Sequence, residues 1–367
     1  MNSSIRELAT PGVRALQPYQ PGKPRSELER EYGITGAIKL ASNENPLGPS
    51  PRGLAAARAA LAEVELYPDS HGFALKQALS AALDVAPGQF VLGNGSNEIL
   101  QLVARAFLNP GDEVVVAQYA FAIFTTEAVS AGGRVVTVPA RDWGADLPAM
   151  REAVTARTRL VFIANPNNPT GTWHRAAELL AFLESLPEHV VVVLDEAYCE
   201  YVSEPDYPNG LDWLSRFPNL IVSRTFSKIY GLAGLRLGYG VGSVEMADLL
   251  NRLREPFAVN NLALAAGAAA LADHDHVERS RRLNAQGLAQ LADACARLGL
   301  DFIPSTGNFI AVDVGRPAGP VYEALLRQGI IVRPLAPYGM PRHLRITIGT
   351  PEQMQRLLAA LPRALAG

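Results

Sequence analysis

The sequence predicts an α/β protein in which a mostly parallel sheet lies between two layers of helices, with a smaller α+β domain attached. Three observations support this prediction. The chain has 367 residues, too many for one small core. Short and continuously apolar strands, such as residues 190–194, alternate with helical stretches. Polar turns containing glycine or asparagine follow several of these strands, as in the βα units of parallel sheets.

Proline and glycine punctuate residues 1–48, which favours an extended arm with turns rather than packed helices. Helices are expected at 52–62 and 74–83. A βα unit follows, with a strand at 90–92, a glycine-rich turn and a helix at 98–107. Further strands are predicted at 113–117, 134–138, 160–163, 190–194, 220–223 and 238–241.

The remainder of the chain has fewer strands. An alanine-rich segment at 262–298 has helical composition, and another helix is expected at 321–328. The strands expected here are 301–303, 309–314, 330–332 and 344–348. We therefore expect a large domain at 49–258 and a smaller one built from the arm, 1–48, and residues 259–367.

Composition argues against several classes of protein. The formal charge of -3 is spread along the chain, which gives no basic footprint for nucleic acid or a membrane surface. No secretory signal or membrane-spanning run is expected. Cys199 and Cys295 cannot form a disulfide framework, and His274 and His276 diverge on a helix, so we expect a cytoplasmic protein without a metal site.

Any amine chemistry has few candidates, because only four of the 33 basic residues are lysines. They are Lys23, Lys39, Lys76 and Lys228. Most lysines lie in solvent, but Lys228 follows an apolar strand and precedes several glycines. Thr225 and Ser227 add hydroxyls nearby, and Arg236 a guanidinium suited to a dianionic phosphate.

Polar side chains also follow other strands. Asp195 directly follows the strand at 190–194, at the end where ligands of open α/β sheets bind, although it could instead be a helix N-cap. Tyr198 follows in the same turn. Asn168 lies in Asn-Pro-Asn-Asn-Pro-Thr-Gly, which could be only a tight turn. Ser96 and Asn97 open a helix after a strand, so they could bind a phosphate at its N-terminus.

These groups match the requirements of pyridoxal phosphate. That cofactor needs a lysine for its aldehyde, a carboxylate facing its ring nitrogen, donors for its ring hydroxyl and an anion site for its phosphate. The sequence offers Lys228, Asp195, Tyr198 with Asn168, and the Ser96 and Arg236 groups for these purposes. We therefore predict pyridoxal phosphate held by Lys228 as a Schiff base.

The order of these motifs resembles the fold-type-I aminotransferases over nearly the whole chain. Several stretches are similar to the histidinol-phosphate aminotransferase family within that group. They are 18–24, 40–49, Tyr67-Pro-Asp69, 224–228, 256–262 and 344–349. This resemblance implies amino-group transfer between L-histidinol phosphate, the amino donor, and 2-oxoglutarate, a 2-oxo acid, in histidine biosynthesis.

The resemblance also implies individual roles. Lys228 would be the general base, Asp195 would pair with the ring nitrogen, and Tyr198 would donate to the ring oxygen together with Asn168. Phe121 would stack on the ring, although Tyr119 nearby leaves the register open. The phosphate ligands would be Ser96, Asn97, Thr225, Ser227 and Arg236. Tyr67 would reach this phosphate from a partner subunit, which implies a homodimer.

Substrate anions need cations of their own. By the same resemblance, Arg345 would bind the carboxylate of glutamate, and with Arg333 and Tyr19 the phosphate of the other substrate, beside Asn168. An arginine in a strand is more often part of a surface ion pair, and Tyr19 could simply pack the arm in place.

Three alternative functions remain in view. An aromatic amino-acid aminotransferase would need only a modest pocket change. A threonine-phosphate decarboxylase would share the cofactor groups and break a different bond. A non-catalytic pyridoxal-phosphate regulator would carry a DNA-binding appendage, for which the arm leaves no room.

Overall fold

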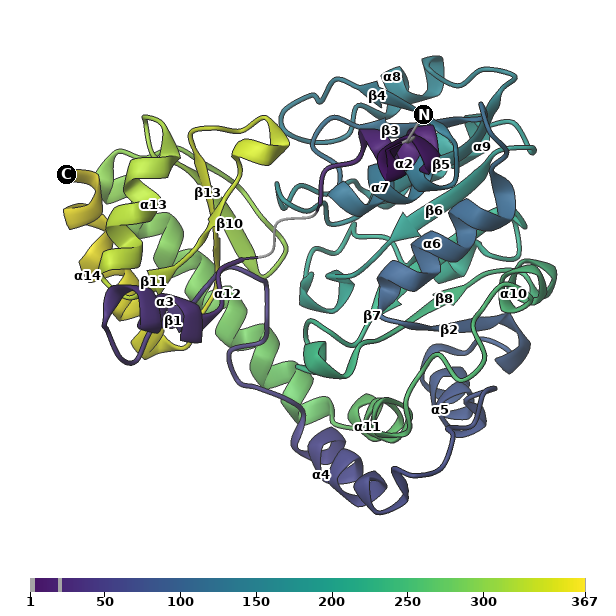
Figure 1. Cartoon of the computed structure of the whole chain (residues 1–367), viewed down its shortest axis with the longest axis horizontal. Helices are drawn as coiled ribbons and strands as arrows, with labels where there is room; N and C mark the ends of the chain where they lie inside the picture. Colours follow the sequence, from purple (N-terminus) through teal and green to yellow (C-terminus); the bar gives the residue numbers. More distant parts are fainter. Residues whose placement is uncertain (1–3, 19–21, 367) are drawn as a thin grey trace.

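The computed structural model describes residues 4–18 and 22–366. Its larger part is a seven-stranded sheet with helices on both faces, and its smaller part is a four-stranded sheet backed by helices (Figure 1). The predicted fold class, a three-layer α/β/α arrangement with a smaller α+β unit, is confirmed.

The seven-stranded sheet has the order β2-β8-β7-β6-β5-β3-β4. Its strands are β2 (Phe90–Asn94), β3 (Glu113–Ala117), β4 (Arg134–Val138), β5 (Thr158–Ala164), β6 (Val191–Asp195), β7 (Leu220–Thr225) and β8 (Leu237–Val241). Only β8 among these strands runs in the opposite direction. The carboxyl ends of β2, β5, β6 and β7 therefore meet at one edge, together with the start of β8.

Apolar side chains on both faces of the strands explain why helices cover both sides. β6 and β7 are buried along their whole length. One face is covered by α6 (Ser96–Phe107), α7 (Ala122–Ser130) and α10 (Val244–Asn251). The other is covered by α5 (Phe73–Leu83), α8 (Leu147–Glu152), α9 (Ala176–Ser185) and α11 (Asn261–Leu271), with α4 (Pro51–Ala60) packed on α11.

The smaller part is an antiparallel sheet with the order β12-β13-β10-β9. Its strands are β9 (Phe302–Ile303), β10 (Phe309–Asp313), β12 (Arg333–Pro334) and β13 (His343–Thr347). The helices α12 (His274–Leu298), α13 (Ala318–Arg327) and α14 (Pro351–Ala366) pack on it. A separate two-stranded sheet pairs β1 (Ile38–Lys39) with β11 (Ile330–Ile331), which ties the N-terminal arm to this part.

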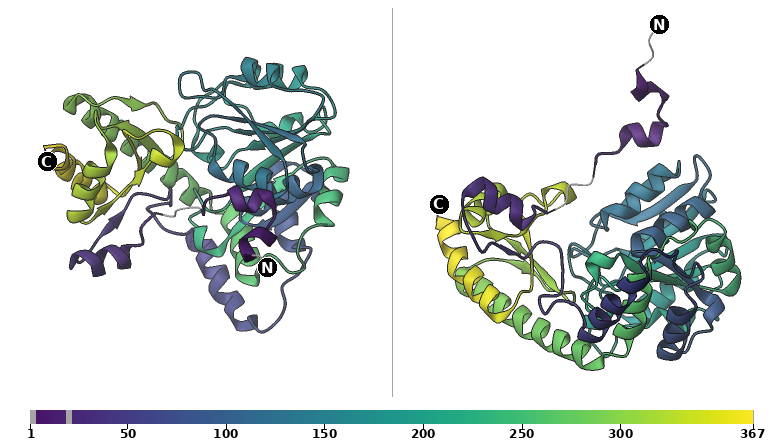
Figure 2. Two further views of the ribbon diagram at one scale, coloured as in Figure 1. Left: turned by 45° about the horizontal axis from the view of Figure 1, so that its top comes forward. Right: turned by 60° about the horizontal axis from the view of Figure 1, so that its bottom comes forward.

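One helix joins the two parts. α12 starts beside α11 and runs along the rim of the molecule to the smaller sheet, as the green helix in Figure 2 shows. It contacts β10 at one end and the short 3-10 helix η3 (Cys199–Tyr201) of the larger part near the other. Residues 40–50 of the arm also run between the two parts (Figure 1).

One sequence expectation about helices was wrong. The arm contains α1 (Ile5–Leu8), α2 (Pro11–Ala15) and α3 (Arg25–Tyr32), and Leu28 of α3 is fully buried. Prolines stand at or just before the first turns of α2 and α3, where they are compatible with a helix start. The segment 262–298 is helical as expected and is divided between α11 and α12, because Asp273 accepts from the His276 amide and caps the start of α12.

Candidate active site

A cavity of about 240 Å³ lies at the carboxyl edge of the seven-stranded sheet. Its walls come from the larger part, from the arm and from β12 and β13 of the smaller part. Twelve residues singled out in the sequence line it: Ser96, Asn97, Phe121, Asn168, Asp195, Tyr198, Thr225, Ser227, Lys228, Arg236, Arg333 and Arg345. The fold therefore gathers side chains from seven separate stretches of sequence into one site.

One end of the cavity is suited to an anion. The N-terminus of α6 has no side-chain cap, since its N-cap residue is Gly95 with φ 79°. The Arg236 guanidinium lies over this glycine, where an added Cβ would stand 2.4 Å from Nη2. A glycine is also required at position 238 of β8, because a Cβ there would clash with the start of α6, 2.2 Å from the Ser96 amide nitrogen. Uncapped N–H groups beside a guanidinium make an anion site.

The hydroxyls at the end of β7 belong to this same end. Thr225 Oγ1 accepts from the Ser227 amide at 3.1 Å, and Ser227 Oγ accepts from Arg236 Nη1 at 3.4 Å. Arg236 has φ 57°, a left-handed conformation that is uncommon for a residue with a side chain. These contacts link the three phosphate-type ligands of the Lys228 segment to the α6 N-terminus.

Asp195 ends β6 inside the cavity, and its side chain is buried. Burial raises the pKa of its carboxyl to about 7, against a backbone hydrogen bond from Ala197 and the charge of Lys228, which lower it. Such a carboxylate is costly to keep charged in the protein alone. A cationic N–H in the cavity would remove that cost, as expected of a carboxylate that faces a pyridinium.

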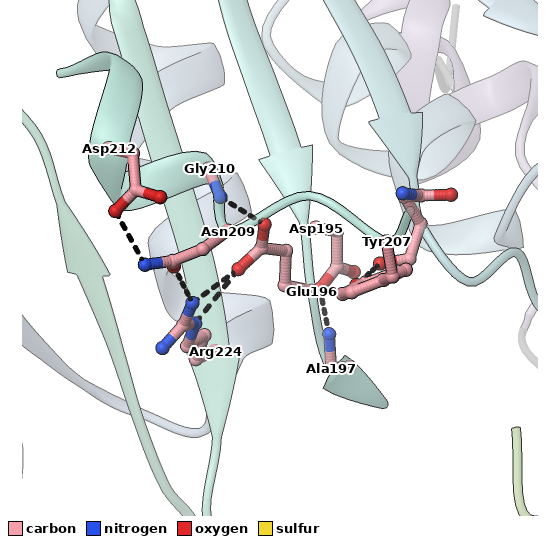
Figure 3. A network of polar contacts seen from close by, with 9 residues as sticks. Asp195, Glu196, Ala197, Tyr207, Asn209, Gly210, Asp212 and Arg224 are labelled. Atoms are coloured by element: carbon pink, nitrogen blue, oxygen red, sulfur yellow. Dashed lines mark hydrogen bonds and ion pairs between the residues drawn. The ribbon is translucent and has the colours of Figure 1, made fainter. Parts of the chain in front are cut away.

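A second carboxylate follows directly in the chain, with a different environment (Figure 3). Glu196 Oε2 accepts from Arg224 Nε at 2.9 Å and Nη2 at 2.7 Å, while its Oε1 accepts from the Gly210 amide at 2.8 Å. Asn209 Oδ1 accepts from Arg224 Nη2 in turn. The pair anchors the strand ends that carry Asp195 and Thr225.

Sequence reasoning did not find the Glu196–Arg224 pair. The available signal was its position, since each residue is next to a predicted site residue at a strand end and so points to the other face of the sheet.

Lys228 and Tyr198 lie together in the cavity. Lys228 Nζ is 5.5 Å from the centroid of the Tyr198 ring. This ring also packs edge-to-face against Phe309 of β10, with centroids 5.4 Å apart. Asn43 of the arm donates its amide to the Tyr198 hydroxyl at 2.8 Å and also lines the cavity, although it was not among the predicted site residues.

The smaller part contributes two cations. Arg333 and Arg345 are directly opposite each other on β12 and β13, and both are buried. They are not surface ion-pair arginines. Arg345 donates from Nη1 to Asn168 Oδ1 at 2.5 Å and from Nη2 to the Ala41 carbonyl at 2.7 Å. Two like charges side by side in a buried wall favour an anionic ligand.

Four aromatic residues were also singled out in the sequence. Phe121 lines the cavity, whereas Tyr119 packs against Trp143 with ring centroids 5.3 Å apart. Tyr67 is 81% exposed and stacks on Phe257, away from this chain's cavity. Tyr19 lies outside the described residues.

The residues therefore fit pyridoxal phosphate. An anion cradle, an amine and a buried carboxylate surround one space, and Asn168 offers its amide nitrogen because its oxygen accepts from Arg345. Residues 4–18 and 22–366 contain no group of three metal-ligating side chains. No helix within them is long and apolar enough to cross a membrane.

Comparison with known proteins agrees with this geometry. Residues 35–361 match the model of the family "Aminotransferase class I and II". A protein from Nitrosococcus oceani named "Histidinol-phosphate aminotransferase 1" is 57% identical over 363 residues, covering 99% of this chain and 98% of its own. One from Pseudomonas aeruginosa named "Histidinol-phosphate aminotransferase 2" is 58% identical over 368 residues, covering 99% of both chains.

Solved structures show the same similarity. The crystal structure of a histidinol-phosphate aminotransferase from Sinorhizobium meliloti in complex with pyridoxal-5'-phosphate superposes with a TM-score of 0.90. It is 35% identical and covers 98% of this chain and 97% of its own.

Proposed function

The chain belongs to the class I and II aminotransferase family, and on that premise we propose that it transfers the amino group of L-histidinol phosphate to 2-oxoglutarate with pyridoxal phosphate as cofactor. The products would be imidazole-acetol phosphate and glutamate, and the pathway L-histidine biosynthesis. One observation carries the proposal. A single cavity holds Lys228 and Asp195 on one side and two buried arginines on the other.

When bound, the cofactor supplies an aldehyde for the amino group and a ring that withdraws electrons from the substrate Cα–H bond. Lys228 would hold the aldehyde, and its Nζ would later take the proton from Cα. Asp195 would accept the ring N–H, with Tyr198 and Asn168 donating to the ring oxygen and Phe121 against the ring face. Ser96, Asn97, Thr225, Ser227 and Arg236 would hold the phosphate.

Arg345 and Arg333 would serve both substrates, with Tyr19 proposed as a further contact. Arg345 would bind the carboxylate of glutamate in one half-reaction, and Arg345 together with Arg333 would bind the phosphate of histidinol phosphate in the other. Their opposed positions on β12 and β13 support this, because both side chains lie on the same face of the sheet.

We also propose a homodimer in which Tyr67 of one subunit reaches the cofactor phosphate of the other. The exposure of Tyr67 and Phe257 supports it, together with Leu61, Val64 and Leu66 nearby in sequence, because apolar side chains gathered on a surface favour an interface. Sedimentation should show a dimer, and a stable monomer with full activity would contradict this arrangement.

Two further points are proposals as well. The chain would divide into an arm at 1–48, a large cofactor-binding domain at 49–258 and a small domain at 259–367, with α11 of the last segment packed on the large domain. The protein would act in the cytoplasm, since Cys199 and Cys295 are unpaired thiols.

Donor specificity tests the proposed function. Purified enzyme given 2-oxoglutarate should form glutamate with a far higher kcat/KM from L-histidinol phosphate than from phenylalanine. Preference for phenylalanine would identify an aromatic aminotransferase instead. Loss of carbon dioxide from a donor without glutamate would identify a decarboxylase.

Arg345 offers a matched variant for the same experiment. Arg345→Ala should reduce kcat/KM by about a hundredfold, or 3 kcal/mol, for histidinol phosphate and for glutamate alike. Arg345→Lys should recover only part of this, because lysine cannot make a bidentate contact. An effect confined to glutamate would refute the shared role.

A further inference from the structure

We infer that Asn43 is a positioning residue that fixes the direction in which the Tyr198 hydroxyl donates its proton. The inference rests on the proposed function. It concerns a residue of the arm whose side chain joins the substrate-binding strand β13 to the phenol beside Lys228.

Asn43 is 1% exposed, and hydrogen bonds hold it on four sides. Its backbone N–H donates to Thr347 Oγ1 at 3.0 Å, and the Thr347 hydroxyl and Asn43 Oδ1 are also 3.0 Å apart. Its backbone carbonyl accepts from Asn308 Nδ2 at 2.9 Å. Its own Nδ2 is 2.8 Å from the Tyr198 hydroxyl.

The hydrogen bonds of this chain run in one direction. Thr347 Oγ1 accepts from the Asn43 backbone N–H, and the Thr347 hydroxyl donates its own proton to Asn43 Oδ1. The amide nitrogen is thereby turned toward Tyr198, and the amide orientation follows from the network. The phenol oxygen accepts from this N–H, so its own proton is donated to a different group.

In the cofactor-loaded protein, that group would be the ring oxygen of pyridoxal phosphate. Tyr198 and Lys228 face the same cavity, and the amide of Asn43 lies in its wall. Hydrogen bonds in one direction along a buried chain reinforce one another, since each donor polarises the next. Asn43 therefore makes the phenol a donor toward the cofactor, where an oppositely turned amide would draw the phenol proton to itself.

The backbone at Asn43 agrees with a positioning role. Its φ of 57° is left-handed, which asparagine tolerates better than most residues. The arm around it is held by β13, because the Leu40 carbonyl accepts from the Thr347 amide and the Ala41 carbonyl from Arg345. The substrate arginine and the phenol are thus tied to one short segment of chain.

The test is the pH midpoint of the visible absorbance change of the cofactor-loaded protein, measured without substrate. Donation to the ring oxygen favours its anionic form, so losing that donation raises the midpoint. Asn43→Gly keeps the left-handed backbone and adds no charge. It should raise the midpoint by about 0.7 pH units, a fivefold change in proton affinity, and Tyr198→Phe by about one unit.

A double-variant comparison separates positioning from general disturbance. In the Tyr198→Phe background, Asn43→Gly should cause no further shift, because the group it acts through is gone. An equal shift in both backgrounds, or none in either, would overturn the inference.

Thr347 provides the second variant in case Asn43→Gly does not fold, which thermal unfolding of the cofactor-free protein would reveal. Thr347→Val removes the hydroxyl that turns the amide and should raise the midpoint, whereas Thr347→Ser should restore the original value. Equal midpoints for Val and Ser would overturn the inference. If the unaltered protein shows no visible band with pyridoxal phosphate, the proposed function itself fails, and the inference with it.

Discussion

Asp195 and Glu196 are consecutive, buried carboxylates at the end of β6, yet the fold treats them in opposite ways. Glu196 receives two hydrogen bonds from Arg224 and one from a backbone amide. Asp195 receives one backbone hydrogen bond, and burial raises its pKa to about 7. Side chains alternate across a strand, so the two carboxylates face different surroundings.

This difference suggests how to tell a structural carboxylate from a functional one. The environment of Glu196 is complete within the protein, and its role is to hold the strand ends in place. The environment of Asp195 is incomplete without a cationic ligand, which is what a cofactor site requires. Burial alone, which both share, does not distinguish them.

The largest expected effect concerns turnover in Asp195→Asn. This change keeps the shape and removes the charge that would face the ring nitrogen. We expect kcat to fall by about a thousandfold, or 4 kcal/mol, with the cofactor still bound, because the ring would lose its electrostatic partner. Steady-state kinetics with absorbance measures both, and near-normal turnover would refute the proposed role.

A smaller effect of a different kind is expected for Glu196→Gln. Here the buried Arg224 charge would lose its counter-ion, so the free energy of unfolding should fall by about 3 kcal/mol. Denaturant unfolding of the cofactor-free protein measures this change. Glu204→Gln, at an exposed carboxylate, is the control and should leave stability unchanged. A stable Glu196→Gln protein with reduced turnover would reverse the distinction between the two carboxylates.

The smallest expected effect is a pH dependence. The pKa of Asp195 is raised from 3.8 to about 7 in the folded state, so its contribution to stability is present below pH 3.8 and is lost as pH rises through about 7. Between about pH 5 and 7 the cofactor-free protein should lose about 2 kcal/mol more than Asp195→Asn does. Parallel stability curves for the two proteins would show that this pKa is not raised.

Much of the larger sheet could be predicted from sequence because both of its faces are buried. The predicted bounds of β3 and β4 are exact, and those of the other strands in this sheet are within two residues at either end. The polar residues that follow such strands must gather at one edge, which is why Asp195, Asn168 and Lys228 were predicted together. The phosphate-type ligands followed from the same reasoning.

The remainder depended on tertiary contacts that no local pattern reveals. α3 forms because Leu28 is buried against the smaller part, so the extended arm predicted from the surrounding proline and glycine was wrong here. The position of Asn43 depends on its hydrogen bond with Thr347 of β13, a residue far away in the sequence. The Glu196–Arg224 pair likewise joins two strands that are adjacent only in the folded sheet.

The most direct test of the account is the identity of the amine that holds the cofactor. Protein loaded with pyridoxal phosphate, reduced with borohydride and digested, should carry the label at Lys228 and not at Lys23, Lys39 or Lys76. Lys228→Ala should lose both the label and the visible absorbance band. Label at another lysine, or a band that persists in Lys228→Ala after dialysis, would contradict the central claim.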